Sequence, residues 1–222
     1  MAERRVFAAI KNPRRRVGLA NMRTQPLHDG HTGILNLMIS ACETAILGLG
    51  SAQKTPDEHD PWPIENRIQQ ARNVYGDRIK VVPLQDLGST SGTNDWIDYV
   101  LEKISKLGLP EPTDYYTGSE ADAIWYRERF YRKFFSPVDE NVDLPEVHDD
   151  TVPEEYDIYY TDEGVLRRLH IRTREMTQVP SATELRMFMA LRTDGWKRFV
   201  PYVNHELVES TYPEEFRVRK SD

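Results

Sequence analysis

The sequence predicts an α/β fold: a Rossmann-like, doubly wound, mostly parallel sheet with helices on both faces, plus an insertion containing a β-hairpin. Short apolar runs alternate along most of the chain with longer segments of helical periodicity, which is typical of βαβ units. The 222 residues are 39% hydrophobic and 29% charged, a globular balance with enough apolar side chains for a sizeable core. No internal repeat is apparent.

Four strands are expected in the first part of the chain because short, mostly apolar runs end at polar or glycine-containing turns. The helices between them carry apolar residues three and four positions apart, as Trp96, Ile97 and Val100 do. The expected strands are 17–21, 45–49, 79–84 and 114–117. The expected helices are 32–43, 64–74, 95–107 and about 120–135.

The remaining segments break this alternation. Residues 52–63 contain three prolines and predict a polar loop. Residues 136–155 are acidic and contain prolines, which indicates an exposed loop or insertion. Residues 156–161 and 165–172 resemble two strands joined by a DEG turn. A helix is expected over 181–191.

This pattern predicts one main domain with appendages. We expect a basic N-terminal extension over 1–16, a single domain over 17–208 with an insertion at about 120–177, and a C-terminal tail over 209–222. Ligands of such sheets bind beyond the carboxyl ends of the strands, near the point where strand order reverses.

Charge and composition exclude several classes. Asp and Glu total 36 against 29 for Lys and Arg, so the net charge of −7 argues against a nucleic-acid binder. No apolar run approaches the ~20 residues that a membrane helix needs, so no membrane partner is expected. Cys42 is the only cysteine, so an internal disulfide is impossible and a reducing, cytoplasmic setting is expected.

His28, Gly30 and His31 follow the first strand and open the first long helix. Both imidazoles can donate to phosphate oxygens, and glycine lets the backbone approach a ligand closely. The helix N-terminus is expected to add free N–H groups and a positive dipole end. A metal site is less favoured because no cysteine or third histidine lies at ligand spacing. Two solvated histidines in a loop remain the alternative.

Ser181 and Glu184 have the spacing of a capping box, which explains both residues without a function. Thr183 and Arg186 are not explained in this way. At the start of a helix, they place a hydroxyl and a guanidinium where an anion would bind.

Together these motifs resemble the HxGH nucleotidylyltransferase superfamily, and within it the archaeal-type nicotinamide mononucleotide (NMN) adenylyltransferases. The resemblance covers roughly 17–120 and 178–208 in collinear order. The chain departs from the family pattern at Met22, Thr24, Pro63, Asn66 and Ser119. The matching segments are 23–31, 50–53, 60–62 with Arg67, 83–86, 96–100, 117–119 and 181–186 with 196–201.

The resemblance implies an enzyme that transfers AMP from ATP to a phosphorylated acceptor, most simply NMN, releasing NAD and pyrophosphate. Mg²⁺ would bridge the phosphates, and no protein metal ligand is expected. The resemblance implies catalytic roles for His28, His31 and Arg186. It implies nucleotide binding by Arg23, Gln25, Gly30, Gly118, Ser181 and Thr183. It implies acceptor binding by Ser51, Gln53, Trp62, Arg67 and Trp96.

Several points stay open at this stage. Trp96 either stacks on a ligand ring or packs in the core of an amphipathic helix. The acceptor could instead be a sugar phosphate or pantetheine phosphate, with ATP or CTP as donor, and a non-catalytic nucleotide sensor is a further alternative. We expect a homo-oligomer, with segment 120–177 forming part of the acceptor-side wall or a subunit contact.

Overall fold

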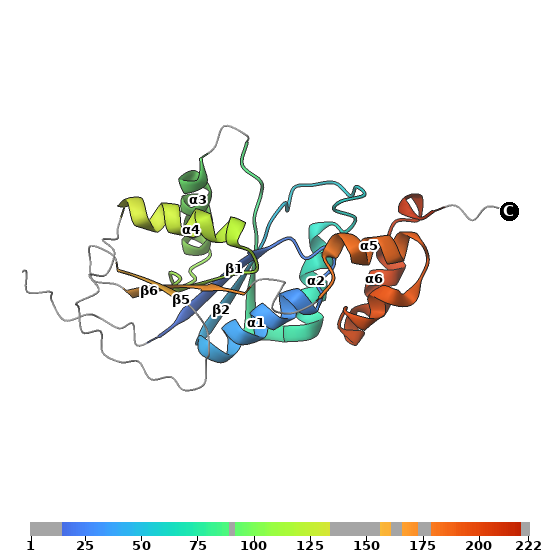
Figure 1. Ribbon diagram of the computed structural model, residues 1–222, viewed down its shortest axis with the longest axis horizontal. Helices are drawn as coiled ribbons and strands as arrows, with labels where there is room; N and C mark the ends of the chain where they lie inside the picture. The colour runs from blue at the N-terminus through green and yellow to red at the C-terminus, as the bar shows by residue number, and fades with distance from the viewer. Residues whose placement is uncertain (1–14, 89–91, 134–155, 161–165, 173–178, 219–222) are drawn as a thin grey trace, which may run out of the picture.

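The computed structural model describes residues 15–88, 92–133, 156–160, 166–172 and 179–218. Its centre is a six-stranded sheet of order β3-β2-β1-β4-β6-β5 (Figure 1). All neighbouring strands pair in parallel except β5, which is antiparallel to β6. The strands are β1 (Val17–Met22), β2 (Thr44–Leu49), β3 (Ile79–Pro83), β4 (Asp114–Thr117), β5 (Tyr156–Tyr160) and β6 (Leu166–Ile171).

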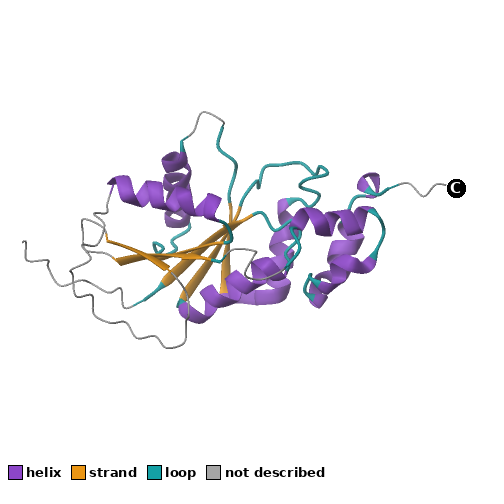
Figure 2. Ribbon diagram, in the orientation of Figure 1, coloured by secondary structure: helices purple, strands orange, loops and turns teal. Residues whose placement is uncertain are grey.

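Helices cover both faces of this sheet, as expected (Figure 2). On one face lie α1 (Asp29–Ala41) and α2 (Ile64–Tyr75), and on the other lie α3 (Thr93–Lys106) and α4 (Glu120–Lys133). The predicted fold class is confirmed. A short 3-10 turn, η1 (Gly76–Arg78), leads into β3. Among the described residues, no helix is long and apolar enough to cross a membrane.

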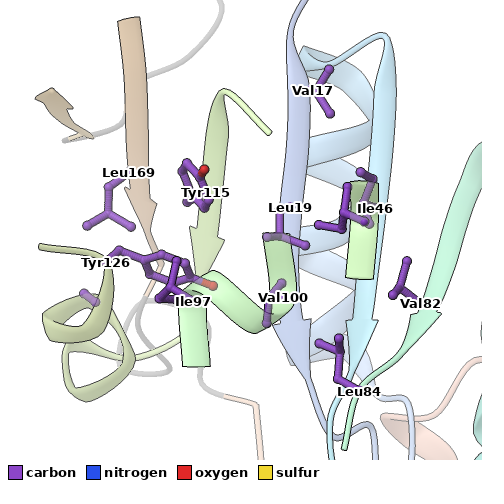
Figure 3. Packing of buried hydrophobic residues seen from close by; sticks show 12 residues of the cluster. Val17, Leu19, Ile46, Val82, Leu84, Ile97, Val100, Tyr115, Tyr126 and Leu169 are labelled. Carbon is purple, nitrogen blue, oxygen red and sulfur yellow. The ribbon is translucent and has the colours of Figure 1, made fainter. Parts of the chain in front are cut away.

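Each face of the sheet has its own core, because side chains of successive strand residues point to opposite faces. On the α3–α4 face, Leu19, Ile46 and Val82 of β1, β2 and β3 pack against residues such as Ile97 and Tyr126 (Figure 3). On the other face, the alternate strand residues pack with Ile34, Leu35 and Met38 of α1 and with Ala71 and Tyr75 of α2.

The strand order reverses between β1 and β4. From β1 the chain proceeds through α1 to β2 and β3 on one side, and through α3 it returns to place β4 on the other side. The carboxyl ends of these two strands, at Met22 and Thr117, therefore border the crevice where ligands of doubly wound sheets bind.

The hairpin expected in the insertion is present, and it extends the central sheet. Strand β6 pairs in parallel with β4, from Asp114 opposite Arg168 to Thr117 opposite Ile171. The described elements of segment 120–177, α4, β5 and β6, are therefore part of the α/β fold. The DEG turn and residues 136–155 lie outside the described residues.

A third core lies beyond the carboxyl edge of the sheet, in the C-terminal helices (Figure 1). Trp62 packs there with Leu185 and Tyr212. The structure thus differs from the expected tail over 209–222: Tyr212 is buried, and the amide of Val218 donates to the carbonyl of Ala190. The elements here are α5 (Ala182–Ala190), η3 (Asp194–Arg198), η4 (Tyr202–Asn204), α6 (His205–Thr211) and η5 (Glu214–Phe216).

Candidate active site

The histidine pair caps the first helix. His28 is the N-cap of α1, and its Nδ1 accepts a hydrogen bond from the amide of Gly30 at 3.1 Å. Nδ1 of His31 accepts in turn from the amide of His28 at 3.3 Å, and the two ring centroids lie 4.0 Å apart. Because Nδ1 accepts in both rings, each neutral imidazole carries its proton on Nε2 and is a donor there.

The expectation of free backbone amides at this helix start is wrong. The amide of Asp29 donates to the carbonyl of Phe199 at 2.8 Å, and the amide of Gly30 donates to the His28 ring. The amide of His31 donates to the carbonyl of His28 at 2.8 Å. An anion at this end of α1 therefore meets the two imidazoles and the helix dipole.

Gly30 is needed at its position. A Cβ atom there would lie 2.9 Å from Cε1 of His28, so any larger residue would displace the imidazole. Gly118, at the end of β4, is also close-packed, since its Cβ would lie 3.1 Å from Cδ1 of Ile34. Both predicted nucleotide-binding glycines thus leave room for a neighbouring side chain, His28 at the N-cap of α1 and Ile34 within it.

Two cavities meet at the end of β1. The first, which we name the histidine lobe, encloses about 480 Å³ between the start of α1 and the start of α5. The second, the tryptophan lobe, encloses about 430 Å³ between the loops after β2 and β3 and the helices α3 and α4. The lobes share Asn21, Met22, Arg23 and Asp122. The two lobes therefore adjoin at the carboxyl end of β1, and we call this shared boundary the seam.

Eight of the predicted site residues line the histidine lobe, with Arg23, Gln25 and Gly118 in the loops after β1 and β4. His28, Gly30 and His31 line it from α1, and Thr183 and Arg186 line it from α5. The two segments are more than 150 residues apart in the sequence, and hydrogen bonds from Arg186 to Gln25 and from Asp29 to Phe199 hold α5 and its third core beside the start of α1.

Arg186 is held in place by its neighbours. Its Nη1 donates to the carbonyl of Gln25 at 2.8 Å and its Nη2 donates to Oγ1 of Thr183 at 3.1 Å. Burial lowers the pKa of this guanidinium, and the charge of Asp60 opposes that effect. A guanidinium fixed by two acceptors presents its remaining N–H groups in a defined direction, which suits a phosphate group.

Ser181 acts as the N-cap of α5. Its Oγ accepts from the amide of Glu184 at 3.2 Å, and the Glu184 carboxylate accepts from the amide of Ser181 at 2.7 Å. This is the reciprocal capping box that the spacing indicates. Ser181 is not among the residues that line the histidine lobe, whereas Thr183 is.

On the acceptor side, Ser51 and Gln53 hold Asp86. Oγ of Ser51 donates to the Asp86 carboxylate at 2.9 Å, and Nε2 of Gln53 donates to it at 3.2 Å. The Oε1 atom of Gln53 accepts from the amide of Asp86 at 3.0 Å. The loops after β2 and β3 are thereby joined, and Ser51 and Asp86 line the tryptophan lobe.

Arg67 is a buried support rather than a cavity residue. Its Nη1 donates to the carbonyls of Arg23 and Gly50 at 2.9 and 2.7 Å, and its Nη2 donates to that of Ser51 at 3.1 Å. The backbone at Ser51 is strained, with φ +55°, and Thr24 has φ +50°. Arg67 thus fixes the two strained turns that follow β1 and β2.

Trp62 is likewise a buried support, and it is held by Gln25, which lines the histidine lobe. The side chain of Gln25 makes two 3.0 Å hydrogen bonds with the backbone of Trp62, one as donor and one as acceptor. Trp62 is 1% exposed and belongs to the third core, so it does not reach either lobe. Of the two tryptophans proposed for stacking, only Trp96 lines a lobe.

Several lining residues were not predicted from the sequence, among them Asp60 and three residues of α4. Asp60, 2% exposed, lines the histidine lobe and pairs with Nζ of Lys54 at 2.8 Å. Asp122, Trp125 and Tyr126 line the tryptophan lobe from α4. The aromatic residues of this helix were visible in the sequence, but periodicity alone does not tell which of them faces a cavity.

Comparisons with known proteins show what the chain resembles in sequence and in fold. No family model matches the chain. The chain is 28% identical over 126 residues to a nicotinamide-nucleotide adenylyltransferase of Pyrococcus abyssi, a match that covers 54% of this chain and 63% of that relative. A Methanospirillum hungatei enzyme of the same name is 32% identical over 68 residues, covering 29% of this chain and 39% of that relative.

The chain is related to the archaeal nicotinamide-nucleotide adenylyltransferases. It matches less than two thirds of the length of these relatives. Among solved structures, a bifunctional NMN adenylyltransferase/ADP ribose pyrophosphatase of Francisella tularensis superposes with a TM-score of 0.60 at 15% identity, covering 91% of this chain and 51% of that one. The NadR protein in complex with NAD and AMP-PNP superposes with a TM-score of 0.55 at 18% identity, covering 87% and 46%. These structures share the fold.

Proposed function

We propose that the protein transfers the adenylyl group of ATP to NMN, forming NAD and pyrophosphate. The observation that carries the proposal is the two-lobed site at the end of β1. Imidazole and guanidinium donors gather in one lobe and tryptophans line the other. The relatedness to nicotinamide-nucleotide adenylyltransferases supports the same reaction.

The histidine lobe suits the triphosphate. Nε2–H of His28 and of His31 donates to phosphate oxygens, and Arg186 contacts the phosphates across the lobe. An oxygen of the acceptor phosphate attacks the α-phosphorus, a new P–O bond forms, and the bond to the β-phosphate breaks to release pyrophosphate. The acceptor phosphate is already anionic, so positioning and charge stabilisation provide the catalysis without a protein nucleophile or base.

Mg²⁺ belongs to the proposal as a companion of the triphosphate. The ion prefers oxygen ligands and retains several waters. No group of three or more His, Cys, Asp or Glu side chains that could hold a metal occurs in the described part of the chain. The lobe instead offers phosphate-binding donors, which fits an ion held by phosphate oxygens and water. When bound, it would neutralise charge that develops on the leaving pyrophosphate.

The tryptophan lobe suits the base of the acceptor. Trp96 lines it from α3, and its Nε1 is buried with no hydrogen-bond partner among the described residues. An indole ring at this position can stack on the base of the acceptor. Arg23, which lines both lobes, can contact the acceptor phosphate at the seam.

The test is a matrix of nucleoside triphosphates against phosphorylated acceptors, read by pyrophosphate release and by identification of the product. We expect turnover with ATP and NMN, and NAD as product. The donors are ATP and CTP, and the acceptors are NMN, sugar phosphates and pantetheine phosphate. Turnover only with another acceptor would replace the proposed acceptor, and binding of ATP without any turnover would favour a nucleotide sensor.

A further inference from the structure

One face of α4 carries an unusual set of side chains toward the tryptophan lobe. Asp122, Trp125 and Tyr126 have the i, i+3, i+4 spacing that places residues on one side of a helix, and all three line the lobe. Tyr126 is also part of the core, whereas Trp125 is 41% exposed. A large indole left open beside a cavity is available to a ligand.

The position of this face is fixed relative to Trp96 on α3. Nε of Arg129 donates to the Asp98 carboxylate at 3.0 Å and thereby joins α4 to α3. The hydroxyl of Tyr126 accepts from Nδ2 of Asn21 at 2.9 Å, which ties α4 to the end of β1. The two tryptophans therefore approach one lobe from two helices that are held together.

The charge in the lobe is negative. Asp86 and Asp122 both line it, and Arg23 is the only cationic residue among its described lining residues. Asp86 keeps its place through Ser51 and Gln53. Arg23 and Asp122 line both lobes, and phosphates in the histidine lobe would attract the Arg23 guanidinium and repel the Asp122 carboxylate.

We propose that Asp122 and Trp125 make the tryptophan lobe selective for a flat ring that carries a positive charge. This inference rests on the proposed function: the ring is the pyridinium of NMN. The disfavoured ligands are the same nucleotide with an uncharged, reduced ring, and the analogue with a carboxylate in place of the carboxamide. The residues involved act on acceptor selection and not on the transfer step.

Two physical effects give this selectivity. The face of an indole attracts a cation, and the attraction is stronger when water is excluded. Carboxylates beside the ring stabilise its positive charge and repel an added carboxylate. Asp86 and Asp122 are exposed, so each contributes the modest amount typical of solvent-screened charges, and the indoles supply most of the ring affinity.

The experiment compares kcat/KM for three acceptors: NMN, reduced NMN and the carboxylate analogue. We expect the native protein to prefer NMN over both. Asp122→Asn should lower the ratio of kcat/KM for NMN to kcat/KM for the carboxylate analogue by about fivefold, which is the size of effect that one screened surface charge allows. Trp125→Ala should raise KM for NMN about fivefold or more and leave KM for ATP within about twofold. Trp125→Phe should recover most of the loss, because an aromatic face is retained.

Matched controls lie on the same helix. Ile124→Ala removes an apolar side chain that is 48% exposed and does not line the lobe, and Glu120→Gln removes a carboxylate outside it. Both should behave like the native protein. An unchanged acceptor preference in Asp122→Asn, or a Trp125→Ala variant equal to Ile124→Ala, would overturn the inference.

A turnover-independent measurement separates this inference from the proposed function. Tryptophan fluorescence is titrated with 1-methylnicotinamide, a cation, and with neutral nicotinamide. We expect the cation to quench at lower concentration in the native protein, with the difference reduced in Asp122→Asn, which retains all 4 tryptophans. Equal quenching by both rings would contradict the inference even if NAD forms. Selective quenching in a protein that makes no NAD would contradict only the proposed function.

Discussion

At the residue scale, His28 and His31 have two tasks. Nδ1 of each ring caps the start of α1, and both rings line the histidine lobe. Replacement of either histidine therefore removes a capping acceptor together with a candidate catalytic donor, and loss of a cap costs about 1 kcal/mol. Arg186 offers a cleaner test of the phosphate lobe, because it supports no helix end.

Arg186→Ala should lower kcat by about 10²–10³, the usual effect of removing one donor to developing charge. Arg186→Lys should recover little, since an ammonium cannot reproduce the guanidinium fork that bonds Gln25 and Thr183. Thermal stability should change little in both variants. Steady-state kinetics and thermal denaturation provide the measurement, with exposed Arg198→Ala as control. Unfolding of Arg186→Ala at room temperature would make this residue structural.

At the element scale, two hydroxyl side chains at the start of α5 have different roles. Ser181 holds the capping box with Glu184, and Thr183 lines the lobe and supports Arg186. Ser181→Ala should cost about 1 kcal/mol of stability and leave the Kd for ATP unchanged within about twofold. Thr183→Val, nearly isosteric, should weaken ATP binding severalfold with little loss of stability.

Urea unfolding and calorimetric titration of both variants distinguish the two hydroxyls. If Ser181→Ala weakens ATP binding as much as Thr183→Val does, the serine hydroxyl contacts the nucleotide as the family resemblance implies. If neither variant affects ATP binding, the triphosphate does not lie against α5.

Away from the site, the buried carboxylate of Asp114 connects β1, β4 and β6. Asp114 begins β4 and accepts from Arg16, just before β1, at 2.6 Å, and it lies 3.0 Å from Nε2 of His170 in β6. Burial by itself raises the pKa of Asp114, but hydrogen bonds from His170 and Arg16, the Arg16 charge and the Thr113 hydroxyl outweigh it and lower the pKa to about 2.

This lowered pKa predicts an acid-dependent loss of stability. The unfolded chain binds a proton near pH 3.9, so the ionised carboxylate stabilises the fold fully above that pH. Its contribution, about 2 kcal/mol, is lost as the pH falls from about 4 to 2. Urea unfolding between pH 2 and 5 should show a flatter dependence in Asp114→Asn than in the native protein. The exposed Asp77→Asn should retain the native dependence; equal slopes in all three proteins would contradict the assignment.

At the scale of the whole molecule, Trp62 connects the sheet domain to the C-terminal helices. Its backbone bonds Gln25 beside α1, its Nε1 donates to Oγ1 of Thr211 at 3.0 Å, and its ring lies 5.5 Å from that of Tyr212. The same C-terminal packing holds α5, and thus Arg186, against the start of α1.

Trp62→Ala should therefore destabilise the protein by about 3–5 kcal/mol, as removal of a buried tryptophan does. Trp62→Phe should cost much less and should leave KM for NMN unchanged, because the side chain reaches neither lobe. Denaturant unfolding and acceptor kinetics measure both effects. If a stable Trp62→Phe variant has a higher KM for NMN, Trp62 contributes to acceptor binding and this assignment is wrong.

The sequence by itself determined what local patterns control. The alternation of apolar runs and helical stripes specified most strands and helices, because burial on one or both faces imposes a period on the chain. The placement of His28 and His31 at a helix start, and of Ser181 and Glu184 in a capping box, also followed from short-range spacing. The family resemblance added the expectation that these motifs meet.

Only the tertiary structure decided which side chains reach the site. Arg67 and Trp62 match motif positions, yet they are buried supports, because hydrogen bonds between distant loops set their orientation. Trp125 carries no motif and still lines a lobe, since its direction depends on how α4 packs against α3. The pairing of β6 with β4 was likewise decided by contacts between distant segments. These features depend on contacts between segments far apart in the chain, which local periodicity does not encode.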